Sequence, residues 1–179
     1  DQLERPGAHR GSKVMGSVEF DKVSFAYQED QPVLHEVSLS AKPGEMLALV
    51  GSTGSGKSTL ISLLAGMYHP NSGEVRVDGA AVKDWNFADL RSRYALVQQD
   101  VFLFSDTVRN NVTLYRPIPD SDIMTAAEAM GIKDFLLSLP GGLDYDVKER
   151  GGMLSTGQRQ LLAFLRAYLV NPDVLILDE

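Results

Sequence analysis

The sequence predicts an α/β fold in which a core of parallel strands carries an antiparallel β edge and a helical subdomain. Three short apolar runs, each ending at glycine or a polar residue, are typical of buried parallel strands. They lie at residues 46–50, 94–97 and 174–177. Residues from about 100 to 170 are dominated by helical periodicity instead, and we expect them to form the helical lobe.

The antiparallel edge is predicted from alternating apolar and polar residues in the first half of the chain. The alternation runs over 18–27, and further strands are expected at 33–40 and 74–77. The dipeptide Asp78-Gly79 follows the third of these strands. It predicts a tight hairpin turn into a short fourth strand.

Start and stop signals place the helices of the predicted lobe. The segment DTVRNNV is expected to begin a helix with Asp106 as its cap. Two more helices are predicted at 122–130 and 133–139, the second of them stopped by Pro140. A short helix at 87–93 precedes the lobe.

The stretch GSTGSGKST, residues 51–59, follows the apolar run at 46–50 and leads into a helical stripe from Lys57 to about Gly66. A strand, a glycine-rich loop and a helix in this order form the context of a P-loop. There, backbone N–H groups wrap a polyphosphate at a helix N-terminus. The alternative is an ordinary glycine-rich turn, which the flanking elements disfavour. We therefore predict that the chain binds a nucleoside triphosphate.

Each residue type in this loop has a physical role. Glycine is needed at 54 and 56 because a side chain would keep the backbone away from the phosphate oxygens. Lys57 is expected to reach the β- and γ-phosphates, and Ser58 to bind Mg²⁺. The predicted nucleotide-binding residues of this stretch are Gly51, Ser52, Thr53, Gly54, Ser55, Gly56, Lys57, Ser58 and Thr59.

The last apolar run ends in two carboxylates, Asp178 and Glu179. In a chain that also holds a P-loop, an aspartate at the end of a core strand is the Walker B arrangement. Asp178 is therefore expected to bind Mg²⁺ beside Ser58. Glu179 is placed to polarise the attacking water. The alternative is a solvated strand end, which would be favoured without the P-loop.

Composition limits the possible partners. The net charge is −7 and the basic residues form no cluster, so nucleic acid is not expected as a partner. The absence of cysteine excludes disulfides and thiolate metal sites. No apolar run approaches the about 18 residues that a membrane helix needs. Residues 1–16 are polar without periodicity, and we interpret them as a linker or a remnant outside a domain that spans 17–179.

The heptapeptide LSTGQRQ, residues 154–160, lies between the P-loop and the two terminal carboxylates. It resembles the signature sequence of the ATP-binding cassette (ABC) family. The resemblance covers nearly the whole chain after residue 16 and implies a nucleotide-binding domain with a P-loop NTPase core. The segment 102–111 and the loop of Glu149 and Gly151 are most similar to the exporter branch of the family.

The resemblance also implies roles for single residues. Tyr27 occupies the position of the aromatic residue that stacks on adenine, and the alternative is a core tyrosine of the edge strand. Gln99 matches the glutamine that binds Mg²⁺ or the lytic water, with Gln98 as a close competitor. The implied catalytic residues are Glu179, Gln99 and Lys57, and the implied metal ligands are Ser58, Gln99 and Asp178.

Ser155 opens a predicted helix and has capping-box spacing with Gln158, so it lies at a helix N-terminus suited to an anion. In the resembled family this site closes over ATP held by the opposite subunit. Thr156 departs from the family pattern, which has glycine there, and it narrows the room for a phosphate. The implied signature residues are Leu154, Ser155, Thr156, Gly157 and Gln158.

As a whole, the resemblance implies an ATPase motor domain on the cytoplasmic face of the cell membrane. Its implied cofactors are ATP and Mg²⁺. Its implied partners are a transmembrane domain and a second nucleotide-binding domain, identical or different, that packs head to tail. The alternatives are a nucleotide-gated binding module with little hydrolysis and a soluble ABC-type ATPase. No switch histidine follows Glu179, so we expect a domain without its C-terminal part and with poor hydrolysis by itself.

Overall fold

The structure, a computed structural model, describes residues 15–178. The chain divides into two compact units, one up to Tyr94 and one from Ala95 onward. Most of the linker expected at 1–16, and the expected catalytic residue Glu179, lie outside the described residues. Both units contain strands and helices, which agrees with the predicted α/β class.

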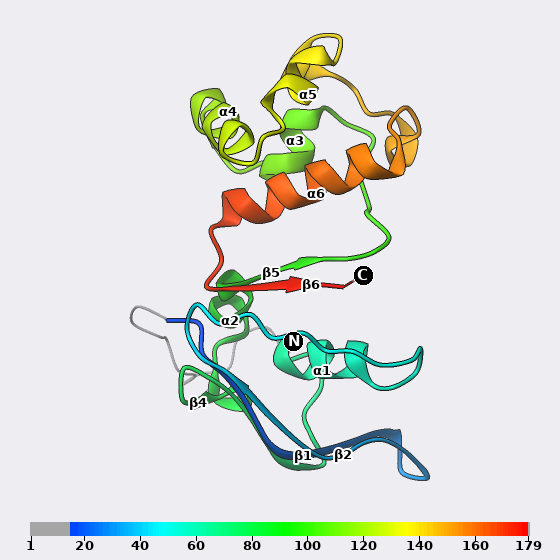
Figure 1. The fold of residues 1–179 in the computed structure, drawn as a ribbon, viewed down its shortest axis with the longest axis vertical. Helices are drawn as coiled ribbons and strands as arrows, with labels where there is room; N and C mark the ends of the chain where they lie inside the picture. Colours follow the sequence, from blue (N-terminus) through cyan, green and yellow to red (C-terminus); the bar gives the residue numbers. More distant parts are fainter. Residues whose placement is uncertain (1–14, 179) are drawn as a thin grey trace. The chain divides into compact units, whose positions relative to one another are not determined.

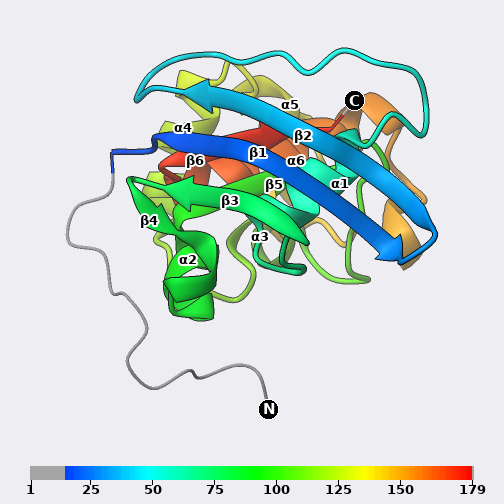
Figure 2. The same cartoon turned by 90° about the horizontal axis from the view of Figure 1, so that it is seen from below.

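The first unit is built on an antiparallel sheet of four strands (Figure 2). The strands, in the spatial order β2-β1-β3-β4, are β1 (Val18–Gln28), β2 (Gln31–Ala41), β3 (Ser72–Val77) and β4 (Ala80–Ala81). Apolar side chains of β1, among them Val18, Phe20 and Phe25, are buried in the core of the unit. The predicted antiparallel edge is therefore confirmed.

A two-residue turn joins β3 to β4, as the dipeptide Asp78-Gly79 predicts. Both residues have positive φ, 48° and 79°, which is typical of a type I′ hairpin. The Asp78 carboxylate also accepts hydrogen bonds from the backbone N–H groups of residues 15, 16 and 17, at 2.8, 3.2 and 2.8 Å. The Ser17 hydroxyl donates a fourth, at 3.0 Å. Asp78 thus fixes the chain where it enters β1.

The described part of the first unit contains two α-helices. α1 (Lys57–Leu64) begins directly after the glycine-rich loop and ends before Gly66, as predicted. α2 (Phe87–Arg93) has the predicted bounds, and the Asn86 side chain caps it by accepting hydrogen bonds from two backbone N–H groups of the first turn. The 3-10 helix η1 (Val82–Asp84) precedes α2.

The apolar run at 46–50 is not a strand, so this part of the prediction is wrong. Its backbone is irregular, and Met46 and Val50 are 94% and 96% exposed. A parallel strand is held by hydrogen bonds to strands from elsewhere in the chain. Within residues 15–178, the sheet of the first unit contains no partner for this run, and the other two predicted parallel strands pair with each other.

The second sheet pairs β5 (Tyr94–Val97) with β6 (Val174–Leu177). The two strands lie side by side and run in the same direction (Figure 1). At their ends the Asp178 N–H donates to the Val97 carbonyl at 2.9 Å. The prediction of parallel pairing is confirmed for these two strands.

One face of this sheet is covered by the helix α6 (Thr156–Val170). Ala95 and Val97 of β5 pack against buried alanines of the helix. Along β6, half-buried and exposed side chains alternate, and Leu175 and Leu177 are exposed. The predicted complete burial of β6 is therefore wrong, because a strand pair with one covered face buries only every second residue.

The helical lobe of the second unit packs around one apolar core. Besides α6, its helices are α3 (Val108–Thr113), α4 (Asp120–Ala129), α5 (Lys133–Ser138), η2 (Gly142–Asp144) and η3 (Glu149–Gly151). Side chains such as Ile123, Leu136 and Leu162 are fully buried in this core. The helices predicted in this region are confirmed, with ends that differ by a few residues.

Thr107, and not Asp106, caps α3. The Thr107 hydroxyl accepts a hydrogen bond from the Asn110 N–H at 3.2 Å. A capping side chain must reach the N–H groups of the first turn, and Asp106 lies one residue too early for this. Asp106 accepts hydrogen bonds from the Tyr115 hydroxyl at 2.6 Å, the Thr107 N–H at 2.6 Å and the Asn110 side-chain amide at 2.8 Å. These bonds lower the pKa of the Asp106 carboxyl, that from Tyr115 most.

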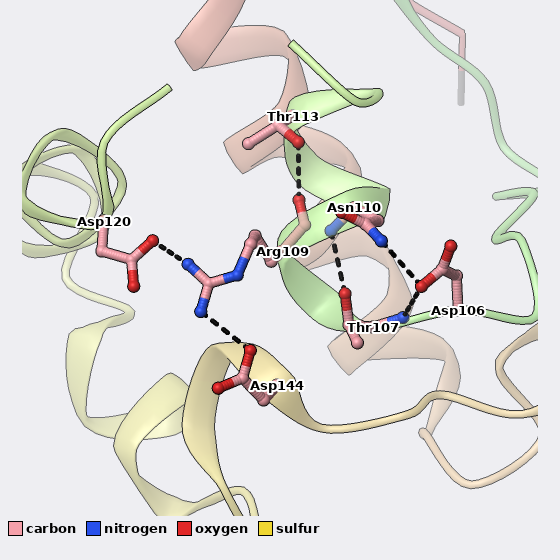
Figure 3. A network of polar contacts seen from close by, with 7 residues as sticks. All are labelled: Asp106, Thr107, Arg109, Asn110, Thr113, Asp120 and Asp144. Atoms are coloured by element: carbon pink, nitrogen blue, oxygen red, sulfur yellow. Dashed lines mark hydrogen bonds and ion pairs between the residues drawn. The ribbon is translucent and has the colours of Figure 1, made fainter. Parts of the chain in front are cut away.

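Arg109 ties α3 to two neighbouring elements (Figure 3). Its guanidinium pairs with Asp120 at the start of α4 and with Asp144 of η2, the second at 2.8 Å. Asp120 also places a negative charge at the N-terminus of α4, where it is favourable. Because these side chains are partly exposed, the ion pairs orient the helices more than they stabilise them.

Asp78→Asn is expected to lower the thermal midpoint of unfolding at neutral pH. Burial raises the pKa of the Asp78 carboxyl, but the hydrogen bonds from residues 15–17 outweigh burial and leave the pKa below its ordinary value. Such a carboxyl stabilises the fold above its unfolded-state pKa of about 3.9, and the stabilisation is lost as pH falls through the lower folded-state pKa. The deficit of the variant should therefore shrink between pH 7 and pH 3. Circular dichroism during heating measures it.

The exposed Asp84 provides a matched control for this experiment. Asp84→Asn should leave the midpoint nearly unchanged at both pH values. A deficit of Asp78→Asn that is as large at pH 3 as at pH 7 would contradict the account, because the ionised carboxylate would then not be the stabilising species.

Candidate nucleotide-binding site

The loop of residues 51–56 forms an exposed bend before α1, with Gly56 alone buried. Gly54 and Gly56 have φ values of +83° and +91°, which favour glycine. A Cβ at Gly56 would lie 2.7 Å from the Leu34 side chain of β2, whereas one at Gly54 would meet nothing within 4 Å. Glycine at 56 is therefore favoured by the backbone conformation, and a side chain there would in addition have to displace Leu34.

Lys57 turns back over this loop. Its ammonium donates hydrogen bonds to the carbonyl oxygens of Gly51 at 2.6 Å and Ser52 at 3.0 Å. The Ser55 hydroxyl lies 3.5 Å from the same nitrogen. An ammonium has three donors and no acceptor, so one group can hold the loop closed and present positive charge to an anion. The structure brings the expected phosphate-binding cation directly to the expected loop.

Tyr27 lies near the end of β1 and is 52% exposed, so it is not a buried core residue. Its hydroxyl oxygen lies 3.2 Å from the hydroxyl oxygen of Thr59 in α1. The rings of Phe25 and Tyr68 pack nearly perpendicular to the Tyr27 ring, with centroids 4.9 and 5.2 Å away. The residue expected to stack on adenine is thereby joined to the helix that follows the P-loop.

The ends of β5 and β6 bring polar side chains to one edge of the second sheet. Gln98 and Gln99 follow β5, Asp178 follows β6, and the Asp178 N–H is bonded to the last residue of β5. Both glutamines are exposed and Asp178 is half-buried. Because the two glutamines share this exposure, the choice of Gln99 over Gln98 stays a prediction. Glu179, the expected base, lies outside the described residues.

The residues expected to bind Mg²⁺ have the donor chemistry of a nucleotide-dependent site. Residues 15–178 contain no group of three or more histidine or acidic side chains that could hold a metal ion by themselves. Mg²⁺ in phosphate sites usually takes only one or two protein ligands, with phosphate oxygens and water completing the octahedron. Ser58 offers an exposed hydroxyl in the first turn of α1, and Asp178 offers a half-buried carboxylate. Both are the hard oxygen donors that Mg²⁺ prefers.

The signature residues form the N-terminus of α6. Ser155 and Gln158 make the predicted capping box: the Ser155 hydroxyl accepts from the Gln158 N–H at 3.2 Å, and the Gln158 side chain accepts from the Ser155 N–H at 2.9 Å. Leu154 is buried and anchors this end of the helix. Because the Ser155 hydroxyl acts as an acceptor in the cap, its proton is left to donate to a ligand.

Thr156 takes the first helical position of α6, so no left-handed backbone conformation is required there. Its hydroxyl accepts a hydrogen bond from the Arg159 guanidinium at 3.1 Å. The space around Gly157 is open, because a Cβ at that position would meet nothing within 4 Å among the described residues. Threonine therefore fits the helix start, and its effect on an approaching phosphate stays a prediction.

Comparison with known proteins identifies the family. The family model for ABC transporters matches residues 34–179, which include the P-loop, the signature and the Walker B strand. The chain belongs to the ABC transporter family. In the described part of this ABC chain, no helix is long and apolar enough to cross a membrane.

Two bacterial relatives and one solved structure show how much of an ABC protein this chain represents. It is 43% identical to the uncharacterized ABC transporter ATP-binding protein YknV of Bacillus subtilis, over 98% of the chain and 29% of YknV. It is 42% identical to the putative multidrug export ATP-binding/permease protein YgaD of the same organism, over 98% of the chain and 31% of YgaD. The chain thus spans about a third of the length of these relatives.

The solved structure is that of a bacterial Atm1-family ABC exporter with ATP bound. The likeness has a TM-score of 0.92 at 36% sequence identity and covers 98% of this chain and 31% of the exporter chain. It confirms the predicted fold class, a P-loop NTPase core with an antiparallel β edge and a helical subdomain. This ABC chain therefore has the fold of the nucleotide-binding domain of an exporter.

The sequence analysis missed two polar residues that shape the segment after Gln99. Asn111 is fully buried, and its side chain exchanges hydrogen bonds with the Phe104 backbone, accepting from the N–H at 2.8 Å and donating to the carbonyl at 3.0 Å. The Arg166 guanidinium of α6 donates to the Asn111 carbonyl at 2.9 Å and to the Phe102 carbonyl at 3.3 Å. Burial lowers the pKa of Arg166. Together they attach the segment to the signature helix.

A sequence signal for Asn111 did exist. It lies between Val108 and Val112, which are both buried, in the helix that the sequence predicts. A polar residue among the buried positions of a helix requires hydrogen-bond partners in the core. The identity of these partners depends on the fold and could not be read from the helix alone.

Asn111→Ala is expected to destabilise this ABC domain by roughly 2–4 kcal/mol, because it removes a fully buried side chain that accepts from the Phe104 N–H and donates to the Phe104 and Thr107 carbonyls. Asn110→Ala is the matched control, since its half-buried side chain donates to the partly exposed Asp106 and its loss should cost about 1 kcal/mol. Urea unfolding measures both variants. Equal stabilities of the two variants would contradict the role given to Asn111.

Proposed function

We propose that this chain binds and hydrolyses Mg-ATP as the motor domain of an ABC exporter. The observation that carries the proposal is the arrangement around the P-loop. The Lys57 ammonium lies on the Gly51 and Ser52 carbonyls, and the exposed Tyr27 ring is joined to Thr59 of the same helix. A cation, the backbone N–H groups of a loop at a helix N-terminus and an aromatic platform are the elements that a nucleoside triphosphate needs.

Within the first unit, the triphosphate would lie in the bend of residues 51–56 at the N-terminus of α1. The backbone N–H groups of the loop would donate to the phosphate oxygens, as such loops do. Lys57 would exchange a carbonyl partner for the β- and γ-phosphates, and Tyr27 would stack on the adenine. Each role uses a group that is accessible in the structure.

The second unit would supply the remaining catalytic groups. Ser58 of α1 with Gln99 and Asp178 would hold the Mg²⁺, which when bound neutralises charge on the phosphates. Glu179 would accept a proton from the attacking water. In phosphoryl transfer, positioning and charge stabilisation supply nearly all of the catalysis. The position of Gln99 and Asp178 at the same edge of the second sheet supports these roles.

A second nucleotide-binding domain would complete the site. The Ser155 hydroxyl proton and the N–H groups at the start of α6 form a donor set for an anion. We propose that they contact the γ-phosphate of ATP held by the opposite subunit in a head-to-tail dimer. The open space at Gly157 leaves room for this approach.

The transmembrane partner is proposed from the relatives. YgaD is described as an ATP-binding/permease protein, and this chain matches 31% of it. The whole protein would therefore place this domain on the cytoplasmic face of the membrane and couple ATP-driven dimerisation to export.

Lys57→Ala should weaken Mg-ATP binding at least about tenfold, because a charge-assisted contact worth roughly 1.5–3 kcal/mol is removed. Isothermal titration calorimetry of the 179-residue chain measures this. Lys42→Ala, an exposed lysine of the same unit, is the control and should keep the parent affinity. An unchanged affinity of Lys57→Ala would overturn the proposed site.

The composite dimer site is tested by complementation in the full-length protein. Lys57→Ala and Ser155→Arg should each abolish most ATPase activity, since each damages both sites of a homodimer. A mixed dimer of the two variants retains one site with an intact P-loop and an intact signature, so co-expression should restore part of the activity. Full activity of Ser155→Arg alone would contradict the shared site.

A further inference from the structure

We propose that Thr59 and Tyr68 are positioning residues that hold the Tyr27 ring for the nucleotide base. The base end and the phosphate end of the site would then be linked by the single hydroxyl contact between Tyr27 and Thr59. This inference rests on the proposed function, because it assumes that Tyr27 stacks on the base. It goes beyond the stacking role of Tyr27, for which the ring alone would be enough to bind the base.

The first observation is the contact between the two hydroxyl groups. Tyr27 belongs to β1 and Thr59 to α1, and their oxygens are 3.2 Å apart. Thr59 is only 5% exposed, so water has little access to this hydroxyl. Ser58, expected to bind Mg²⁺, and Lys57, expected to bind the phosphates, directly precede Thr59 in the sequence. A displacement of the N-terminal turn of α1 would therefore also shift the Tyr27 ring through this hydroxyl contact.

The second observation is the packing of the ring. Phe25 and Tyr68 stand at 86° and 88° to the Tyr27 ring, at centroid distances of 4.9 and 5.2 Å. Phe25 and Tyr68 also contact each other, with centroids 5.6 Å apart. Perpendicular aromatic packing is a favoured geometry. The three rings form a closed group that restrains the Tyr27 ring, while half of its surface stays exposed.

A restrained ring binds a base more tightly than a mobile ring with the same surface. Association costs free energy for every side chain that must be ordered, and a ring that is already fixed avoids this cost. The hydroxyl contact and the packing of Tyr68 therefore act on the affinity for the base. They should not act on the affinity for the phosphates, because the contact uses the Thr59 hydroxyl, whereas the backbone N–H groups at the start of α1 are the groups expected to face the phosphates.

The test compares two ligands, Mg-ATP and Mg-tripolyphosphate, which has the phosphates without the base. Tyr27→Phe and Thr59→Val each remove one hydroxyl of the contact, and valine keeps the backbone N–H and the shape of threonine. Each variant should weaken Mg-ATP by roughly two- to fivefold. Neither should change the affinity for tripolyphosphate, and the double variant should be no weaker than the single variants. Calorimetry of the 179-residue chain gives all affinities.

Matched variants separate the positioning of the Tyr27 ring from general effects of a substitution at Thr59 or Tyr68. Thr59→Ser keeps the hydroxyl and should keep the parent affinity for Mg-ATP. Tyr68→Phe keeps the aromatic packing and should also bind normally, whereas Tyr68→Leu should weaken Mg-ATP alone. Thermal unfolding of each variant identifies any loss of folded protein.

Three results would overturn the inference: parent affinity in Tyr27→Phe, an additive loss in the double variant, or an equal loss of tripolyphosphate affinity in Thr59→Val. Failure of the proposed function gives a different result. In that case the parent chain would bind neither ligand, or Lys57→Ala would bind tripolyphosphate as well as the parent does.

Discussion

The close contact between Gly56 and Leu34 is the constraint on which the candidate nucleotide site depends. A Cβ at 56 would lie 2.7 Å from the Leu34 side chain of β2 and would have to displace it, and the φ of +91° at this position favours glycine in addition. The positive φ of Gly56 then turns the loop back toward the helix N-terminus. Lys57 follows at once and bonds the loop carbonyls. The antiparallel sheet thus determines where the cation and the loop N–H groups lie.

The second unit depends in a similar way on one helix. α6 begins at the Ser155 capping box and carries Arg166 further along, where the guanidinium holds the Phe102 carbonyl. The signature residue and the segment that follows Gln99 are therefore attached to the same rigid element. A displacement of this segment would therefore also move the start of α6. We expect Gln99 and the signature residues to move together for this reason.

Local features of this fold could be predicted from the sequence, and features that depend on distant partners could not. The α1 start, the Asp78-Gly79 turn and the Ser155 capping box are set by a few adjacent residues, and all three are confirmed. The run at 46–50 has the composition of a buried strand, but its conformation depends on partner strands. The contact of Tyr27 with Thr59 joins residues 32 positions apart. No periodicity reveals such a pair, so this part of the candidate site required the structure.

We infer that the loop of residues 51–59 binds the phosphates of ATP through its backbone. Hydrogen exchange of the backbone amides, with and without Mg-ATP, tests this most directly, because an N–H group that donates to a phosphate oxygen exchanges slowly. We expect slower exchange in residues 51–59 on addition of Mg-ATP, and no such change with Mg²⁺ and adenosine. Unchanged exchange in this loop at a saturating concentration of Mg-ATP would contradict it.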